Sequence, residues 1–352
     1  MSMNNVIGPQ FFLFGLGNRM KMIYQNGTLK NCFNGELLWS SEVLDEQILA
    51  ADYSVRIRTA SGWVSITEDE IGVHLTDERG TCSSLSCAPL NLPSFEGHPY
   101  RNAMRILHHD VLINIIDGKP VPNLFVYDKP WYRDSAMMAM VLERTGNISL
   151  ITDWAGGLDE LYDRNNAGVE ESDNLGQLLF LLAVSGHKDH PLIPYAIDEA
   201  KRRMIDGSLT GLSDFAEHPV YQTKWLKYGM ETLGMDTGFI CVPNVTDNYS
   251  GLFWMDGHTE PYDGVYDERY PYLSWARAHT AGFMMDEAHL DALKSPTYPI
   301  SSETEASQAK YKALRPFLPA YAKAHTAAPH TWHASEMFLY LDELYRYKNR
   351  HE

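Results

Sequence analysis

The sequence contains only four cysteines among its 352 residues, and they are scattered along the chain. Cys32, Cys82, Cys87 and Cys241 are too few for the disulfide framework that stabilises small secreted domains. Cys82 and Cys87 are near each other, but no neighbouring histidine completes a zinc site with them. We therefore expect reduced thiols, as in cytoplasmic proteins, and we assign no metal.

The chain also lacks a long apolar segment at its start and an excess of basic residues. The apolar stretch Phe11–Phe14 is short and is followed by Gly15, so it does not resemble a signal peptide. Lysine and arginine number 29 against 46 aspartates and glutamates, for a formal net charge of −17. Nucleic acids and anionic membranes require a basic surface. We therefore expect a cytoplasmic protein that binds neither of them.

Glycine-rich phosphate-binding loops are equally poorly represented. Gly15-Leu16-Gly17 has the spacing of a dinucleotide motif, but the third glycine and the following helix are missing. No cofactor is predicted.

Residues 1–95 show the alternation and turn residues of β-structure. The segment Met20–Tyr24 leads into Asn26-Gly27, a strong signal for a two-residue hairpin turn, and the pattern continues at Thr28. Tyr53–Arg58 alternates in the same way, and Ser61-Gly62 precedes a further strand. These patterns predict a small antiparallel β domain over 1–95.

From residue 96 to residue 352 the pattern changes to apolar helical segments separated by Gly, Pro and Asn clusters. The predicted helices lie near 98–117, 131–145, 148–163, 174–187, 191–206, 213–234, 270–294, 303–324 and 331–349. Consecutive antiparallel helices form αα-hairpins, and this number would close, or nearly close, a ring. The fold class that we predict is mainly α, an (α/α)6-type helical toroid preceded by the β domain.

An Arg-Asp pair stands at the start of one strongly apolar helix, after Pro130. Trp131-Tyr132-Arg133-Asp134-Ser135-Ala136 resembles the W-x-R-D-S-A motif of the glucoamylase family, whose members have the six-hairpin glycosidase fold. The resemblance implies that Arg133 and Asp134 bind sugar hydroxyls. The alternative is local: Asp134 caps the helix and Arg133 pairs with it.

Two further segments resemble a second branch of the six-hairpin group, the unsaturated glucuronyl and rhamnogalacturonyl hydrolases. Asp173-Asn174-x-Gly176 is similar to their D-n-x-G segment, and Trp254-Met255-Asp256-Gly257 looks like their W-x-D-G segment. This resemblance implies that Asp173 and Asp256 are the working carboxylates. The alternatives are an N-cap at Asp173 and an ordinary turn at Asp256.

Carboxylates and aromatic residues collect in the predicted loops, and loops at one end of a toroid converge. This is the composition of a cleft that hydrolyses an oligosaccharide, with one protonated and one ionised carboxyl group. We expect Asp256 or Glu260 to be the acid and Asp173 or Glu336 to be the base. The candidate substrate-binding residues are Trp131, Arg133, Asp134, Asn174, Lys224, Trp225, Trp254, His258, Trp332 and His333.

Three other functions remain open at this point. A sugar epimerase or isomerase would use histidines as proton shuttles, and His258, His279, His330 and His333 are available. A polysaccharide lyase would need a base and a cationic group, which Tyr221, Lys224 and Lys227 offer. A non-catalytic carbohydrate-binding protein would need only the aromatic and hydroxyl-binding residues. The sequence does not specify the sugar, the linkage or the oligomeric state.

Overall fold

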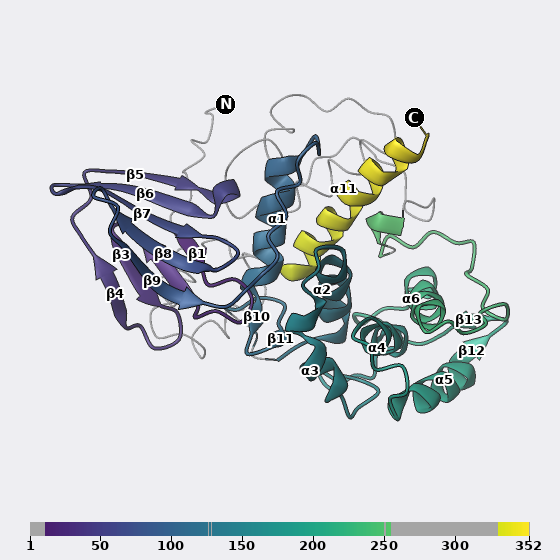
Figure 1. Cartoon of the computed structure of the whole chain (residues 1–352). Coiled ribbons are helices and arrows are strands. Elements are labelled where there is room, and N and C mark those ends of the chain that lie inside the picture. Colours follow the sequence, from purple (N-terminus) through teal and green to yellow (C-terminus); the bar gives the residue numbers. More distant parts are fainter. Residues whose placement is uncertain (1–10, 126, 128, 250, 255–329, 352) are drawn as a thin grey trace, which may run out of the picture. The chain divides into compact units, whose positions relative to one another are not determined.

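The computed structural model describes residues 11–125, 127, 129–249, 251–254 and 330–351 (Figure 1). The chain divides into two compact units. Among the described residues, the first unit, here called the sheet unit, comprises 11–117, 123–125, 127 and 330–334. The second, here called the helical unit, comprises 118–122, 129–249, 251–254 and 335–351.

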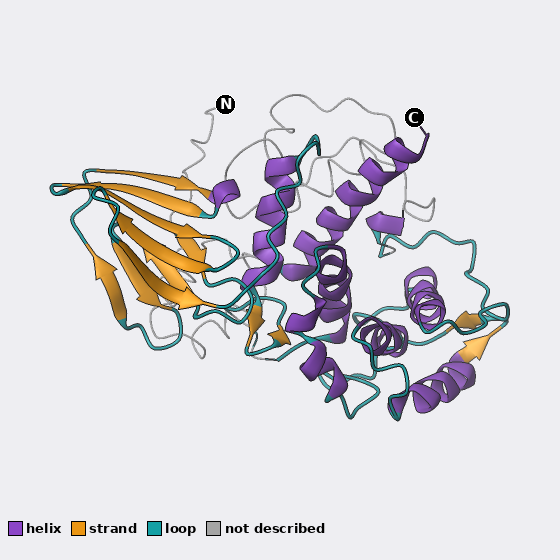
Figure 2. Ribbon diagram, viewed as in Figure 1, coloured by secondary structure: helices purple, strands orange, loops and turns teal. Residues whose placement is uncertain are grey.

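The sheet unit contains two antiparallel sheets, with strand orders β1-β2-β3-β4 and β5-β6-β7-β8-β9 (Figure 2). Their strands are β1 (Phe12–Phe14), β2 (Met22–Gln25), β3 (Thr28–Asn31), β4 (Leu37–Ser40), β5 (Asp45–Leu49), β6 (Ser54–Thr59), β7 (Gly62–Glu68), β8 (Gly72–Asp77) and β9 (Cys82–Cys87). The unit also contains the short helix η1 (Ala50–Asp52), helix α1 (Arg101–Ile113) and the two-residue strand β10 (Ile115–Ile116).

The hairpin predicted at Asn26-Gly27 is confirmed. Gln25 pairs with Thr28, and the two turn residues between them both have positive φ, 45° and 71°. Positive φ at both positions defines the type I′ turn, whose twist matches that of the flanking strands. The antiparallel pairing predicted from the alternation of Tyr53–Arg58 is confirmed as well, because β6 pairs antiparallel with β5 and β7.

A buried ionic network lies inside the sheet unit. The carboxylate of Glu68 on β7 accepts hydrogen bonds from the backbone N–H groups of Gly15 (2.9 Å) and Leu16 (2.7 Å) and from Arg19 (2.9 Å). Lys21 donates to the carbonyl oxygens of Gly15 and Gly17. Burial lowers the pKa of Lys21 to about 7, an effect that Glu68 opposes. The Gly-x-Gly segment therefore binds side chains of its own unit.

The helical unit is built from short helices and small strands. They are β11 (Lys119–Pro120), α2 (Tyr132–Arg144), η2 (Ile148–Leu150), α3 (Thr152–Gly156), α4 (Asp173–Val184), α5 (Leu192–Arg203), β12 (Met204–Ile205), β13 (Ser208–Leu209), α6 (Pro219–Thr232), η3 (Leu252–Trp254) and, from Ser335 onward, α11 (Thr331–His351). The strands β12 and β13 pair across Asp206-Gly207, a turn whose two φ values are 49° and 81°.

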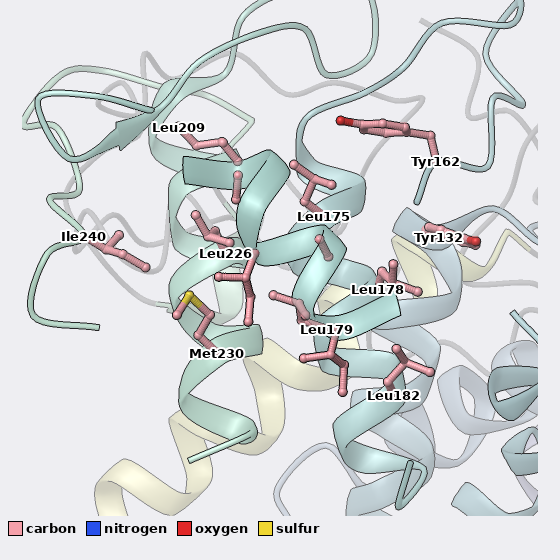
Figure 3. Close-up of a cluster of buried hydrophobic side chains, with 14 residues drawn as sticks. Tyr132, Tyr162, Leu175, Leu178, Leu179, Leu182, Leu209, Leu226, Met230 and Ile240 are labelled. Carbon is pink, nitrogen blue, oxygen red and sulfur yellow. The ribbon is translucent and has the colours of Figure 1, made fainter. Parts of the chain in front are cut away.

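Helix α4 lies at the centre of this unit and contacts α2, α5 and α6. Every residue from Asp173 to Ala183 is buried. From Leu178 onward the helix has apolar side chains on all sides and needs neighbours around it. Four of its leucines belong to a core cluster together with residues of α5 and α6, and Figure 3 shows this cluster. The labelled members are Tyr132, Tyr162, Leu175, Leu178, Leu179, Leu182, Leu209, Leu226, Met230 and Ile240.

Two glycines allow α4 and α6 to pack backbone against backbone. A Cβ atom added at Gly176 would overlap the backbone of Trp225 and Leu226. A Cβ atom added at Gly229 would overlap the carbonyl oxygen of Gly176. Each glycine thus occupies space that no other residue type could share without moving a helix.

We expect Gly176→Ala to destabilise the protein, although alanine is the better helix former. Alanine would gain about 1 kcal/mol in helix propensity, but the overlap with α6 costs roughly 1–3 kcal/mol or more. Gly157→Ala is the control, since its Cβ would meet the nearest backbone atom at an ordinary 3.5 Å. Chemical denaturation of both variants tests this, and a Gly176→Ala protein at least as stable as wild type would contradict the close helix contact.

The predicted mainly-α toroid is wrong. The N-terminal region consists of antiparallel sheets, and the described residues contain seven α-helices, one of them in the sheet unit. Within the described part of the chain, α4 is surrounded by α2, α5 and α6 rather than placed in a ring of successive hairpins. Apolar helical periodicity predicts that a helix is buried, but it does not identify the helices against which it packs. The predicted helices at 270–294 and 303–324 lie outside the described residues.

Two helix predictions within the described residues need correction. The segment 148–163 contains only η2 and the five-residue α3, because Gly156-Gly157 ends the helical run. Helix α6 begins at Pro219 rather than at 213, since proline is well suited to the first turn and disfavours helix before it. Among the described residues, no helix has the length and apolar character that crossing a membrane requires.

Candidate functional site

The N-terminus of α2 is fixed by a loop that is distant in sequence. The backbone N–H of Tyr132 donates to Oδ2 of Asp163 at 2.6 Å, so a carboxylate satisfies a helix-terminal donor. Burial raises the pKa of Asp163, although hydrogen bonds from the backbone of Asn165 and Tyr132 oppose the shift. Asp134 lies in the first turn of α2 and is buried.

Arg133 occupies the centre of a cluster of carboxylates, here called the arginine centre (Arg133, Glu171, Asp173 and Asp214). Its Nε donates to Asp173 Oδ2 at 2.8 Å, and its Nη2 donates to Glu171 Oε1 at 2.8 Å. Nη1 lies 3.6 Å from Asp214 Oδ1. Arg133, Glu171 and Asp173 are buried, whereas the side chain of Asp214 is 45% exposed. The centre thus reaches from the core to the surface through Asp214.

Neighbouring amides complete the hydrogen bonding of these carboxylates. Gln177, one turn along α4, donates to Asp173 Oδ2 at 2.8 Å. Asn166 donates to Glu171 Oε1 and to Asp214 Oδ1, each at 3.3 Å. The backbone N–H of Asp214 also donates to Glu171 Oε1. A buried charge is tolerated only when it is paired and hydrogen-bonded in this way.

An aromatic group lies beside the arginine centre. The ring of Tyr249 has the guanidinium carbon of Arg133 at 5.5 Å from its centroid. Tyr249 contacts Tyr221 edge to face at 4.9 Å, and Tyr221 contacts Trp254 at 6.3 Å. Trp225 lies 5.5 Å from Trp254. We call these four residues the aromatic group, and it is continuous with the arginine centre through Tyr249.

Two ionisable side chains border the aromatic group. The ammonium of Lys224 lies 4.5 Å from the centroid of Trp254, and burial lowers the pKa of Lys224 to about 8. Glu336 on α11 is 7% exposed, and its Oε1 accepts a hydrogen bond from the backbone N–H of Leu252 at 3.2 Å. Burial raises the pKa of Tyr221, and the charges of Asp173 and Glu336 raise it further. Both carboxylates therefore lie within electrostatic reach of this phenol.

Asp247 organises the N-terminus of α6. Its Oδ2 accepts hydrogen bonds from the backbone N–H groups of Val220 and Tyr221, both at 3.0 Å. Its Oδ1 accepts from the backbone N–H of Tyr249 and lies 3.1 Å from Nδ1 of His218. Burial would raise the pKa of Asp247, but the hydrogen bonds from His218 and the backbone outweigh it, so the pKa falls below 3.8. One carboxylate thus caps the helix and places two aromatic rings.

We expect Asp247→Asn to lower the stability of the protein by about 1–3 kcal/mol, because the amide nitrogen cannot accept the backbone hydrogen bonds that the second carboxylate oxygen accepts. Because the pKa of Asp247 is lower in the folded state, its contribution is present above the ordinary value of 3.8 and is lost as pH falls through the folded pKa. The variant should therefore lose less stability than wild type between about pH 4 and pH 2. Urea titrations across pH measure this difference, and parallel acid limbs for the two proteins would contradict it.

The structure places the predicted site residues in three groups. Arg133 and Asp173 are in direct contact, and Asn174 donates to Gln177 beside them at 3.2 Å. Lys224, Trp225, Trp254 and Glu336 lie in or beside the aromatic group. Trp131 is half-buried at the start of α2, while Trp332 and His333 belong to the sheet unit, where His333 lies 4.7 Å from the ring of His330. Asp256, His258 and Glu260 lie outside the described residues.

Sequence reasoning overlooked several residues of the site. Asp214, His218, Asp247 and Tyr249 come from irregular segments that show no periodicity and no recognisable motif. Pro219 marks the start of α6, and this was the only local sign that a cap should be sought nearby. Within the described part of the chain, no three side chains are arranged as a metal site would require.

Comparisons with known proteins found no matching family model, no similar curated protein and no similar solved structure. The expected membership of the six-hairpin glycosidase group, in either branch, is wrong: the described residues form seven α-helices with a four-stranded and a five-stranded antiparallel sheet, and no family evidence supports it. The segments at Trp131, Asp173 and Trp254 are six residues long or shorter. Matches of this length arise from helix starts and turns as well as from common descent, which explains the error.

Proposed function

We propose that this protein is a carbohydrate-active enzyme that hydrolyses a glycosidic bond in an oligosaccharide. The observation that carries the proposal is the continuity between the arginine centre and the aromatic group in the helical unit. Aromatic rings stack on the apolar faces of sugars, while charged and amide groups bind their hydroxyls. Lys224, Trp254, Glu336 and the arginine centre supply both kinds of group within one connected set.

The contacts favour Glu336 over Asp173 as the working carboxylate. Asp173 is fully buried, and both Arg133 and Gln177 bind it, so it acts through the position of Arg133. Glu336 raises the pKa of the Tyr221 phenol through its charge and accepts a hydrogen bond from the backbone N–H of Leu252, which anchors it near the aromatic group. We propose Glu336 as the base that activates water. The acid expected at Asp256 or Glu260 stays a prediction.

A ligand screen with a hydrolysis assay tests this function. Gluco-, manno- and galacto-configured oligosaccharides and uronic oligosaccharides are added to the pure protein, and the melting temperature and the release of reducing ends are measured. A ligand that binds only the folded state raises the melting temperature by mass action. At least one sugar should stabilise the protein and be cleaved. If none of them shifts the transition or yields reducing ends, the proposed function is wrong.

One observation favours a polysaccharide lyase as a second candidate. With a pKa lowered to about 8, a fraction of Lys224 is neutral near neutral pH and can accept a proton, and the cation of Arg133 lies beside the same aromatic group. A lyase breaks the bond by elimination and creates an unsaturated sugar, whereas a hydrolase adds water. Mass spectrometry of the products separates the two, because hydrolysis adds one water molecule to the fragments and elimination does not.

A further inference from the structure

The side chain of His218 lies against the aromatic group. It precedes the first residue of α6, and its ring stacks on Tyr249 with a centroid distance of 4.1 Å and an interplanar angle of 19°. Tyr249 in turn faces Arg133. The imidazole therefore lies against the aromatic group, and its side chain keeps 21% of its surface exposed.

The hydrogen bonding of Asp247 determines which nitrogen of His218 carries the proton. Asp247 is acceptor-only when ionised, and its oxygens accept three backbone N–H bonds in addition to the contact with His218 Nδ1. Nδ1 must then be the donor. In the neutral imidazole the remaining nitrogen, Nε2, is a hydrogen-bond acceptor. The carboxylate thus fixes both the tautomer and the orientation of the ring.

The second ring nitrogen of His218, Nε2, is available as a hydrogen-bond acceptor. Among the described residues, none forms a hydrogen bond with Nε2 of His218, while Nδ1 is held at the buried Asp247. An acceptor on a partly exposed ring that stacks against Tyr249 suits a ligand carrying hydroxyl groups.

We propose that His218 is a substrate-binding residue whose Nε2 accepts a hydrogen bond from a sugar hydroxyl, and that Asp247 is its positioning residue. This inference rests on the proposed function and deepens it, since it assigns a hydroxyl-binding position at the same site. A hydrogen bond of ordinary strength contributes about a factor of ten to affinity.

Two variants of His218 separate binding from structure. His218→Asn keeps a side-chain N–H near the Nδ1 position, and so the bond to Asp247, but removes the acceptor at Nε2. His218→Gln retains an acceptor close to the Nε2 position and gives up the bond to Asp247. For a sugar cleaved in the oligosaccharide panel, we expect His218→Asn to raise KM about tenfold. kcat should fall much less, and His218→Gln should retain more of the affinity.

Nitrogen NMR provides a second test, whose readout is the tautomer of His218 in the wild-type protein. Spectra of ¹⁵N-histidine-labelled protein at about pH 8.5, where imidazoles are neutral, should show the Nδ1–H tautomer for the signal that is missing in His218→Gln. Addition of the sugar should shift the Nε2 resonance. An Nε2–H tautomer, or wild-type KM in His218→Asn, overturns the inference while the proposed function stands. Absence of turnover by wild type on every sugar of the panel overturns the proposed function and, with it, this role of His218.

Discussion

Replacement of Arg133 by methionine is expected to lower the free energy of unfolding by about 3–5 kcal/mol, the usual effect of removing one partner from a buried ion pair. Methionine fills a similar length but leaves Glu171 and Asp173 as buried charges without their cation. Denaturant titration of the variant measures the loss. Activity on any sugar cleaved by wild type should fall as well, because Asp214 would lose its contact with the guanidinium.

Arg164→Met is the matched control for this experiment. Arg164 also forms two ion pairs, with Glu160 and Glu170, each at 2.9 Å, but its side chain is 45% exposed. Exposed pairs contribute about 0–1 kcal/mol, since water solvates the charges in either state. A loss of similar size in Arg133→Met and Arg164→Met would mean that the arginine centre is not a desolvated network.

A second substitution tests whether the unpaired carboxylates cause the loss. In the Arg133→Met background, Asp173→Asn replaces a buried charge by a neutral amide that can still accept from Gln177. Part of the stability should return, so the two changes should be strongly non-additive. Additive losses would indicate that Arg133 stabilises α2 through packing instead.

The sequence predicted best where the signal is local. Asn26-Gly27 predicts its hairpin because only a few residue types accept positive φ at both turn positions. The pairing of Arg133 with Asp173 was not predicted as a contact, although both residues were singled out. Each lies in the first turn of a buried helix, where a charged side chain is costly unless it is paired with an opposite charge.

The architecture could not be predicted in the same way. A helix that is apolar on all sides, such as α4, must be buried, but its sequence does not reveal whether it belongs to a toroid or to a central position among other helices. Gly176 and Gly229 look like weak points in two helices until the close approach of α4 and α6 is seen. Asp247 illustrates the same limit, because a cap supplied from 27 residues away leaves no local motif.

Glu336→Gln is expected to reduce the rate of glycoside hydrolysis by about 10²–10⁴, the range for removal of a general base. The amide oxygen can still accept the hydrogen bond from Leu252, so melting temperature and sugar binding should change little. Glu343→Gln, seven residues further along α11, is the control, since this carboxylate pairs with Arg144 at 2.6 Å. The control should keep its activity. Initial rates at saturating sugar test the role of Glu336. Full activity in Glu336→Gln would mean that another carboxylate is catalytic. Equal losses of activity in both variants would show that α11 contributes only through its structure.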